Sequence, residues 1–61
     1  MIITNAINET FNLATMTGWE VKRLAKELRA EVTIYQHNLT KRNFLQDQLD
    51  EVDAEIRRKM Y

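Results

Sequence analysis

The chain of 61 residues contains no cysteine, no proline, one glycine and one histidine. The absence of cysteine excludes a disulfide and a thiolate zinc site, and leaves no indication of a redox compartment. His37 has no second histidine to pair with, and the chain has no glycine-rich loop or nucleophile motif. We therefore expect a protein that is not an enzyme and that binds no metal and no cofactor.

Excess charge of either sign is also absent, because nine Lys and Arg balance nine Asp and Glu. Electrostatically driven nucleic-acid binders carry excess positive charge, so the composition disfavours that class. No apolar run approaches the ~20 residues that a membrane span needs, and the start of the chain lacks the pattern of a signal peptide. We expect a cytoplasmic protein that makes no membrane contact.

The scarcity of helix-breaking residues fits an all-α chain. Two series of apolar residues are spaced alternately by three and four positions, which is the heptad period of packed helices. The spacing predicts an antiparallel, coiled-coil-like hairpin of two helices over residues 18–36 and 41–60, and Thr17 and Glu20 have capping-box spacing at its start. Residues expected to face each other are Val21 and Ile56, Ala25 and Val52, Leu28 and Leu49, and Val32 and Leu45.

The reversal of the chain is predicted at residues 37–40. Asn38 tolerates the left-handed backbone conformation that ends many helices, and Thr40 is a suitable N-cap for the helix that follows. Next to the turn, we expect the guanidinium of Arg42 to lie over the ring of Tyr35. A single unbroken helix, paired with a second chain, is the alternative, but it would place Arg42 in the core.

The first sixteen residues are predicted to contain a short amphipathic helix over residues 4–15. Ile3, Ile7 and Phe11 fall on one face of that helix. Asparagine and threonine are frequent here and are poor helix formers, so the segment needs a surface to lie on. That surface is either its own hairpin or another chain. The predicted fold is thus a single small all-α domain with three helices.

A core this small often needs association for stability. The apolar residues outside the hairpin seam predict a homo-oligomer, most simply a dimer, together with a protein partner. Trp19 is expected in the core beneath the first helix, with an interface as the alternative. The predicted function is a non-enzymatic protein–protein interaction module, such as an inhibitor, adaptor or assembly factor, acting through Ile3, Ile7, Phe11, Trp19 and Leu24.

The alternative function is a small dimeric nucleic-acid-binding protein. It would use the basic face of the second helix, with Trp19 one turn before it. In the predicted hairpin the acidic residues of 47–55 come level with these cations, so a self-neutralising surface competes with this interpretation. The basic residues concerned are Lys22, Arg23, Lys26 and Arg29.

Overall fold

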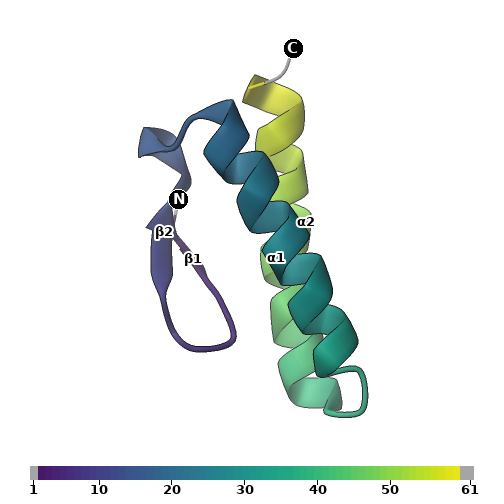
Figure 1. The fold of residues 1–61 in the computed structure, drawn as a ribbon. Coiled ribbons are helices and arrows are strands. Elements are labelled where there is room, and N and C mark those ends of the chain that lie inside the picture. Colours follow the sequence, from purple (N-terminus) through teal and green to yellow (C-terminus); the bar gives the residue numbers. More distant parts are fainter. Residues whose placement is uncertain (1, 60–61) are drawn as a thin grey trace.

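A computed structural model describes residues 2–59 of the chain. Two short strands come first, β1 (Ile2–Thr4) and β2 (Thr10–Asn12), followed by a 3₁₀ turn, η1 (Leu13–Thr15). Two long helices complete the chain, α1 (Gly18–Ile34) and α2 (Leu39–Lys59). Figure 1 shows the helices packed side by side and antiparallel, with the β-hairpin beside them.

The packing of α1 on α2 confirms the predicted pair of helices, and the reversal between them excludes one unbroken helix. The apolar residues that the heptad spacing placed between the two helices form the centre of the core. Val32 and Ile56 among them are partly buried. The N-terminal part of the chain adds Ile3 and Leu13 to this core. Its buried apolar residues are Ile3, Leu13, Val21, Leu24, Ala25, Leu28, Leu45, Leu49 and Val52.

The predicted N-terminal helix over residues 4–15 is wrong, because this stretch contains a two-stranded antiparallel sheet. The fold is therefore not all-α. In the register of the sheet Ile3 pairs with Phe11, and these two side chains pack against the helical core. Cross-strand partners share one face of a sheet, so apolar residues eight positions apart suit a hairpin as well as a helix.

Asn5 organises the loop between the strands, and the residue is 6% exposed. Its amide oxygen accepts hydrogen bonds from the backbone N–H groups of Ile7 (3.1 Å) and Glu9 (2.9 Å). Its amide nitrogen donates to the Glu9 carboxylate at 2.9 Å. Asn8 has φ of 63°, a left-handed conformation that asparagine tolerates. Local side-chain bonds of this kind compete with helix formation and favour the turn.

Polar side chains of the two helices bond to the backbone of the hairpin. The N–H of Thr4 donates to Gln48 Oε1 at 3.0 Å, and the N–H of Ala6 donates to Glu31 Oε1 at 3.1 Å. Strand β1 packs against α2. Neither N–H bonds to the opposite strand, so these bonds satisfy two backbone donors that would otherwise lack a partner. They also fix the β-hairpin on the helices.

The capping box predicted for the first residues of α1 is confirmed. Thr17 Oγ1 accepts from the N–H of Glu20 at 3.2 Å, and Glu20 Oε1 accepts from the N–H of Thr17 at 3.1 Å. The helix ends at Ile34, two residues before the predicted end. The start of α1 is thus held by its own sequence, independently of the hairpin packed beside it.

The turn between the helices differs from the prediction in detail. Among residues 2–59 the one non-glycine residue with positive φ is Asn8, so Asn38 does not end α1 in a left-handed conformation. Asn38 caps α2 instead, because its side-chain oxygen accepts from the N–H of Lys41 at 3.3 Å. Thr40 consequently lies inside α2 rather than at its cap.

The cation beside Tyr35 is also different from the one predicted. Lys41 Nζ lies 4.5 Å from the centre of the Tyr35 ring, whereas Arg42 turns its guanidinium to the side-chain oxygen of Asn43 at 3.0 Å. Lys41 thus takes the place beside Tyr35 that was expected of Arg42. Met60, the last residue of the predicted third helix, lies outside the described residues.

Candidate interaction surface

Trp19 is the most exposed large apolar side chain among the described residues, with 84% of its surface accessible. The expectation that it lies in the core is wrong. It occupies the second position of α1, and the N-terminal segment that was expected to cover it forms a hairpin elsewhere on the helices. A tryptophan in this position leaves a large apolar ring in water.

Three cations surround this ring. Trp19, Lys22, Arg23 and Lys26 are separated by three and four positions, which places them on one side of α1, where they line a shallow hollow of about 350 Å³. All four are exposed, and no carboxylate of residues 2–59 lies within 4.0 Å of the three cationic groups. We call these four residues the Trp19 face.

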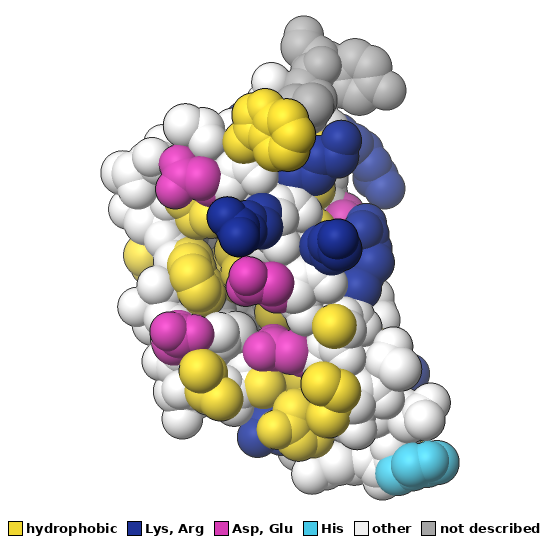
Figure 2. All heavy atoms as spheres, in the orientation of Figure 1, with side chains coloured by type: hydrophobic (Ala, Val, Ile, Leu, Met, Phe, Trp, Pro, Cys, Tyr) yellow, Lys and Arg dark blue, Asp and Glu magenta, His cyan; other side chains and the backbone are white. Residues whose placement is uncertain are grey.

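The basic surface continues from α1 onto α2. Lys22 lines a second hollow together with Arg29 and Arg57, where the two helices meet. Arg29 forms an ion pair with Asp53 at 3.2 Å, so its charge is matched within the chain. In Figure 2, Lys and Arg side chains gather near one end of the molecule beside a large hydrophobic side chain, and acidic side chains lie both at that end and further along.

The residues predicted to bind a protein partner do not form one surface. Ile3 and Leu24 are buried in the core, at 1% and 3% exposure, so they are not available to a partner in this structure. Phe11 is half-buried, and Ile7 is exposed in the hairpin loop. Of these five residues, Trp19 alone joins the cations of the alternative prediction. The spacing of Trp19 from these cations predicted that they share one face of the helix. The sequence did not predict that Trp19 is exposed, because its exposure depends on where residues 2–12 pack.

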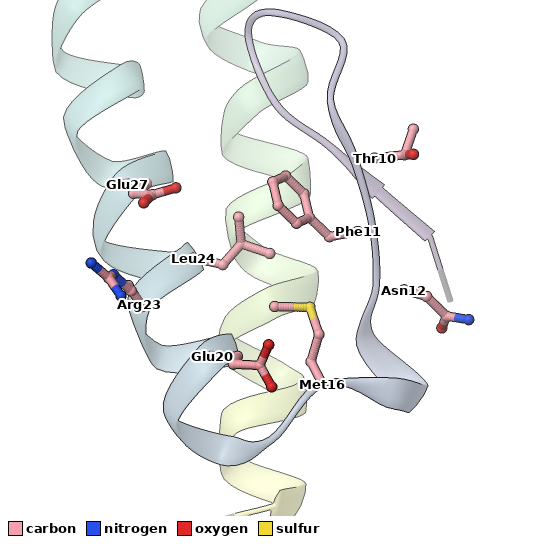
Figure 3. Close-up of a pocket in the computed structure, with 8 residues that line it drawn as sticks. All are labelled: Thr10, Phe11, Asn12, Met16, Glu20, Arg23, Leu24 and Glu27. Carbon is pink, nitrogen blue, oxygen red and sulfur yellow. The ribbon is translucent and has the colours of Figure 1, made fainter.

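A groove of about 400 Å³ separates β2 from α1 (Figure 3). Phe11 projects from β2 toward Leu24, and the thioether of Met16 lies beside them, so the floor of the groove is apolar. The helix side of its rim carries both signs of charge, from Glu20, Arg23 and Glu27. The strand side consists of Thr10, Phe11 and Asn12.

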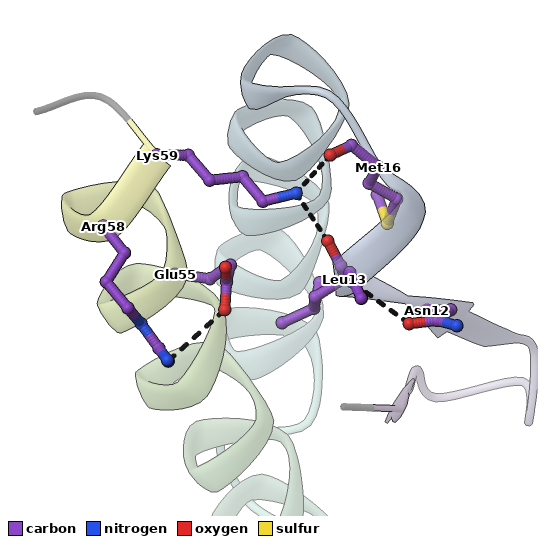
Figure 4. Close-up of polar contacts among 7 residues, drawn as sticks. Asn12, Leu13, Met16, Glu55, Arg58 and Lys59 are labelled. Carbon is purple, nitrogen blue, oxygen red and sulfur yellow. Dashed lines mark hydrogen bonds and ion pairs between the residues drawn. The ribbon is translucent and has the colours of Figure 1, made fainter.

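Lys59 joins the end of α2 to η1. Its ammonium donates to the carbonyl of Leu13 at 2.6 Å and also to the carbonyl of Met16 (Figure 4). The preceding residue, Arg58, pairs with Glu55 at 3.3 Å. Lys59 therefore positions the segment that leads into Trp19, and we assign it a structural role.

Glu20 is the carboxylate nearest in sequence to Trp19. The pKa of Glu20 lies below its ordinary value. The largest cause is the hydrogen bond from the backbone N–H of Thr17, and the second is the hydroxyl of Thr17. This carboxylate serves as a helix cap. Within residues 2–59 no three histidine, aspartate or glutamate side chains are grouped so that they could hold a metal ion. No helix in this part of the chain is long and apolar enough to cross a membrane.

Comparison of the chain with protein-family models, with curated proteins and with solved structures finds no match.

Proposed function

We propose that the protein is a non-enzymatic interaction module that binds an acidic protein surface through the Trp19 face. The observation that carries the proposal is the 84% exposure of Trp19 beside three exposed cations, none of which is ion-paired with a carboxylate of residues 2–59. Tryptophan and arginine are the residues most enriched at the energetic centres of protein interfaces. A partner that covers the ring removes a large apolar surface from water.

The charges around Trp19 favour a partner with carboxylates. Lys22, Arg23 and Lys26 are exposed in the free chain, and an acidic surface would speed association and orient the complex. The four residues are presented on a capped helix, so little backbone freedom is lost when they bind. The partner we propose therefore has an apolar depression bordered by Asp or Glu.

Single-stranded nucleic acid is the second candidate partner of the same face. An exposed aromatic ring beside cations is the arrangement on which bases stack. Arg29 is paired with Asp53, which leaves three of the four predicted cations for phosphates, and the net charge of the chain is zero. Because so few cations are available, we favour the protein partner.

Zero-length carbodiimide cross-linking in a lysate of the source organism tests the proposal. The reagent joins a lysine amine to a carboxylate only when the two are in contact. We expect amide links from Lys22 or Lys26 to an acidic peptide of one protein, and few from Lys41, which packs on Tyr35. Trp19→Ala should abolish these links, whereas Ile34→Ala, at another exposed apolar residue of α1, should preserve them.

Two results would overturn the protein-binding proposal. The first is the absence of links at Lys22 and Lys26, and the second is linking that persists in Trp19→Ala. A separate titration distinguishes the second candidate, because stacking on a deoxythymidine oligonucleotide would quench the fluorescence of Trp19. Quenching at low salt that weakens steeply as salt is added would favour nucleic acid.

A further inference from the structure

The outer edge of β2 is an unpaired strand edge. Asn5 donates its N–H to the carbonyl of Glu9 at 3.1 Å, so these opposite residues occupy the position of a hydrogen-bonded pair, although the N–H of Glu9 donates to the Asn5 side chain and not to its carbonyl. Such pairs alternate with non-bonded pairs along an antiparallel ladder, which makes Ile3 and Phe11 the next bonded pair. The peptide groups of Thr10 and Asn12 must then point away from β1.

Two observations agree with this alternation. The N–H of Thr4, which is opposite Thr10, turns away from β2 and donates to Gln48. The carbonyl of Asn12 accepts from the hydroxyl of Thr15 at 3.1 Å, on the outer side of the strand. Among residues 2–59, no group outside the hairpin bonds to the N–H or the carbonyl of Thr10 or to the N–H of Asn12.

We propose that β2 pairs edge to edge with β2 of a second copy of the chain, which joins the two hairpins into one four-stranded antiparallel sheet. With the two-fold axis beside Phe11, Thr10 of each copy lies opposite Asn12 of the other. Because these residues carry the outward peptide groups, each such pair can exchange two hydrogen bonds, with the carbonyl of Asn12 accepting a second bond beside the one from Thr15. The strand is thus complementary to itself in this register.

The side chains at the edge fit the same arrangement. Phe11 of the two copies forms the non-bonded pair, in which side chains approach most closely, and both rings remain over the apolar floor at Leu24 and Met16 (Figure 3). The rim of the groove carries Arg23 and Glu27, so opposite charges can meet across the axis. No lysine or proline on β2 blocks pairing, and two neutral chains do not repel each other.

A foreign peptide fits this edge less well than a second copy. The rim has no single sign of charge that would select a basic or an acidic peptide, because Arg23 lies between Glu20 and Glu27 in sequence. A second copy supplies the same mixed set in reverse order. The proposed dimer does not depend on Trp19, which does not line the groove.

Sedimentation equilibrium over a range of concentrations tests this pairing. We expect the wild-type chain to reach twice the mass of one chain. Thr10→Pro removes an outward N–H without touching the ladder within the hairpin, and should weaken the dimer by about tenfold or more. Ile2→Lys, at an exposed residue on β1 rather than β2, should leave dimerisation unchanged.

Thr10→Lys is the second variant, in case proline disturbs the hairpin. It keeps the backbone donor and places two like charges close to the axis, so we expect it to shift the equilibrium toward monomer, with an unchanged circular dichroism spectrum. A wild-type chain that is monomeric at all concentrations, or dimers that persist in both Thr10 variants, would overturn the proposal. Trp19→Ala should retain the dimer. Its loss in that variant would instead move the dimer contact to the Trp19 face.

Discussion

Replacement of Asn5 by alanine tests directly whether the start of the chain is a hairpin. In the structure this side chain accepts two backbone hydrogen bonds, from Ile7 and Glu9, and donates a third to the Glu9 carboxylate. Asn5→Ala removes all three and leaves two amide donors without their acceptor. A helix over the same residues would respond in the opposite direction, because alanine is a better helix former than asparagine.

The expected loss follows from the partners of Asn5. A neutral hydrogen bond contributes about 0.5–1.5 kcal/mol net, and a bond to a charged group contributes more. Ile7 and Glu9 are exposed, so water replaces part of what is lost. We therefore expect Asn5→Ala to lower the free energy of unfolding by about 2 kcal/mol. If the segment were helical, the same substitution would raise it by a few tenths of a kcal/mol, about 0.5 at most.

Urea unfolding followed by far-ultraviolet circular dichroism measures this difference. Asn12→Ala is a matched control, because Asn12 is exposed and its side chain accepts one bond, from the N–H of Ala14 at 3.0 Å. We expect the control to cost about 0.5–1 kcal/mol. A wild-type or higher midpoint for Asn5→Ala would refute the hairpin and the role assigned to Asn5.

Three further predictions concern the core, the loop and the first cap. Leu28 is fully buried, so Leu28→Ala should destabilise by about 2–5 kcal/mol in the same urea assay, whereas Ile34→Ala should change stability by about 0.5 kcal/mol at most. Asn8→Val should cost about 1–2 kcal/mol because of the positive φ, and Asn8→Gly should be close to neutral; equal midpoints for the two would contradict the loop conformation. Because the folded pKa of Glu20 is lowered, the stability that its ionised form adds is present above the ordinary pKa and is lost as pH falls through the folded value. The melting temperature of wild type should therefore exceed that of Glu20→Gln at neutral pH, and thermal melts should show this gap closing in acid.

The helical hairpin was predictable because its signal is repeated along both helices. The apolar series through Val21, Leu28, Leu45 and Val52 keeps its period over several turns, and each of these residues is buried. A long periodic pattern has few competing interpretations. The capping box at Thr17 was equally predictable, since the bonds that form it are local.

The hairpin at the start of the chain was not predictable from its apolar residues alone. Ile3 and Phe11 have a spacing that satisfies a helix and a β-hairpin alike, and each strand has three residues. Part of what selects the hairpin lies far away in sequence, in the bonds from Gln48 and Glu31 to its backbone. The local signals were the asparagine and threonine content and Asn8, which accepts positive φ.

The exposure of the Trp19 face also depends on the β-hairpin at the start of the chain. The spacing of Trp19 from its cations placed them on one side of a helix, and this part of the site was predictable. Whether Trp19 was covered depended on where residues 2–12 pack. Burial of Leu24 likewise follows from tertiary packing, since Phe11 and Met16 lie beside it in the groove.

The most direct measurement of the central claim uses the one tryptophan of the chain. Quenching of Trp19 fluorescence by iodide and by caesium reports both its exposure and the charge around it. Cations at Lys22, Arg23 and Lys26 attract the anion and repel the cation. We therefore expect the ratio of iodide to caesium quenching at low salt to exceed the ratio for N-acetyltryptophanamide, and added salt to reduce this excess. Weak quenching by both ions would show that Trp19 is covered, and a ratio at or below that of the free indole would contradict the basic surroundings on which the proposed function depends.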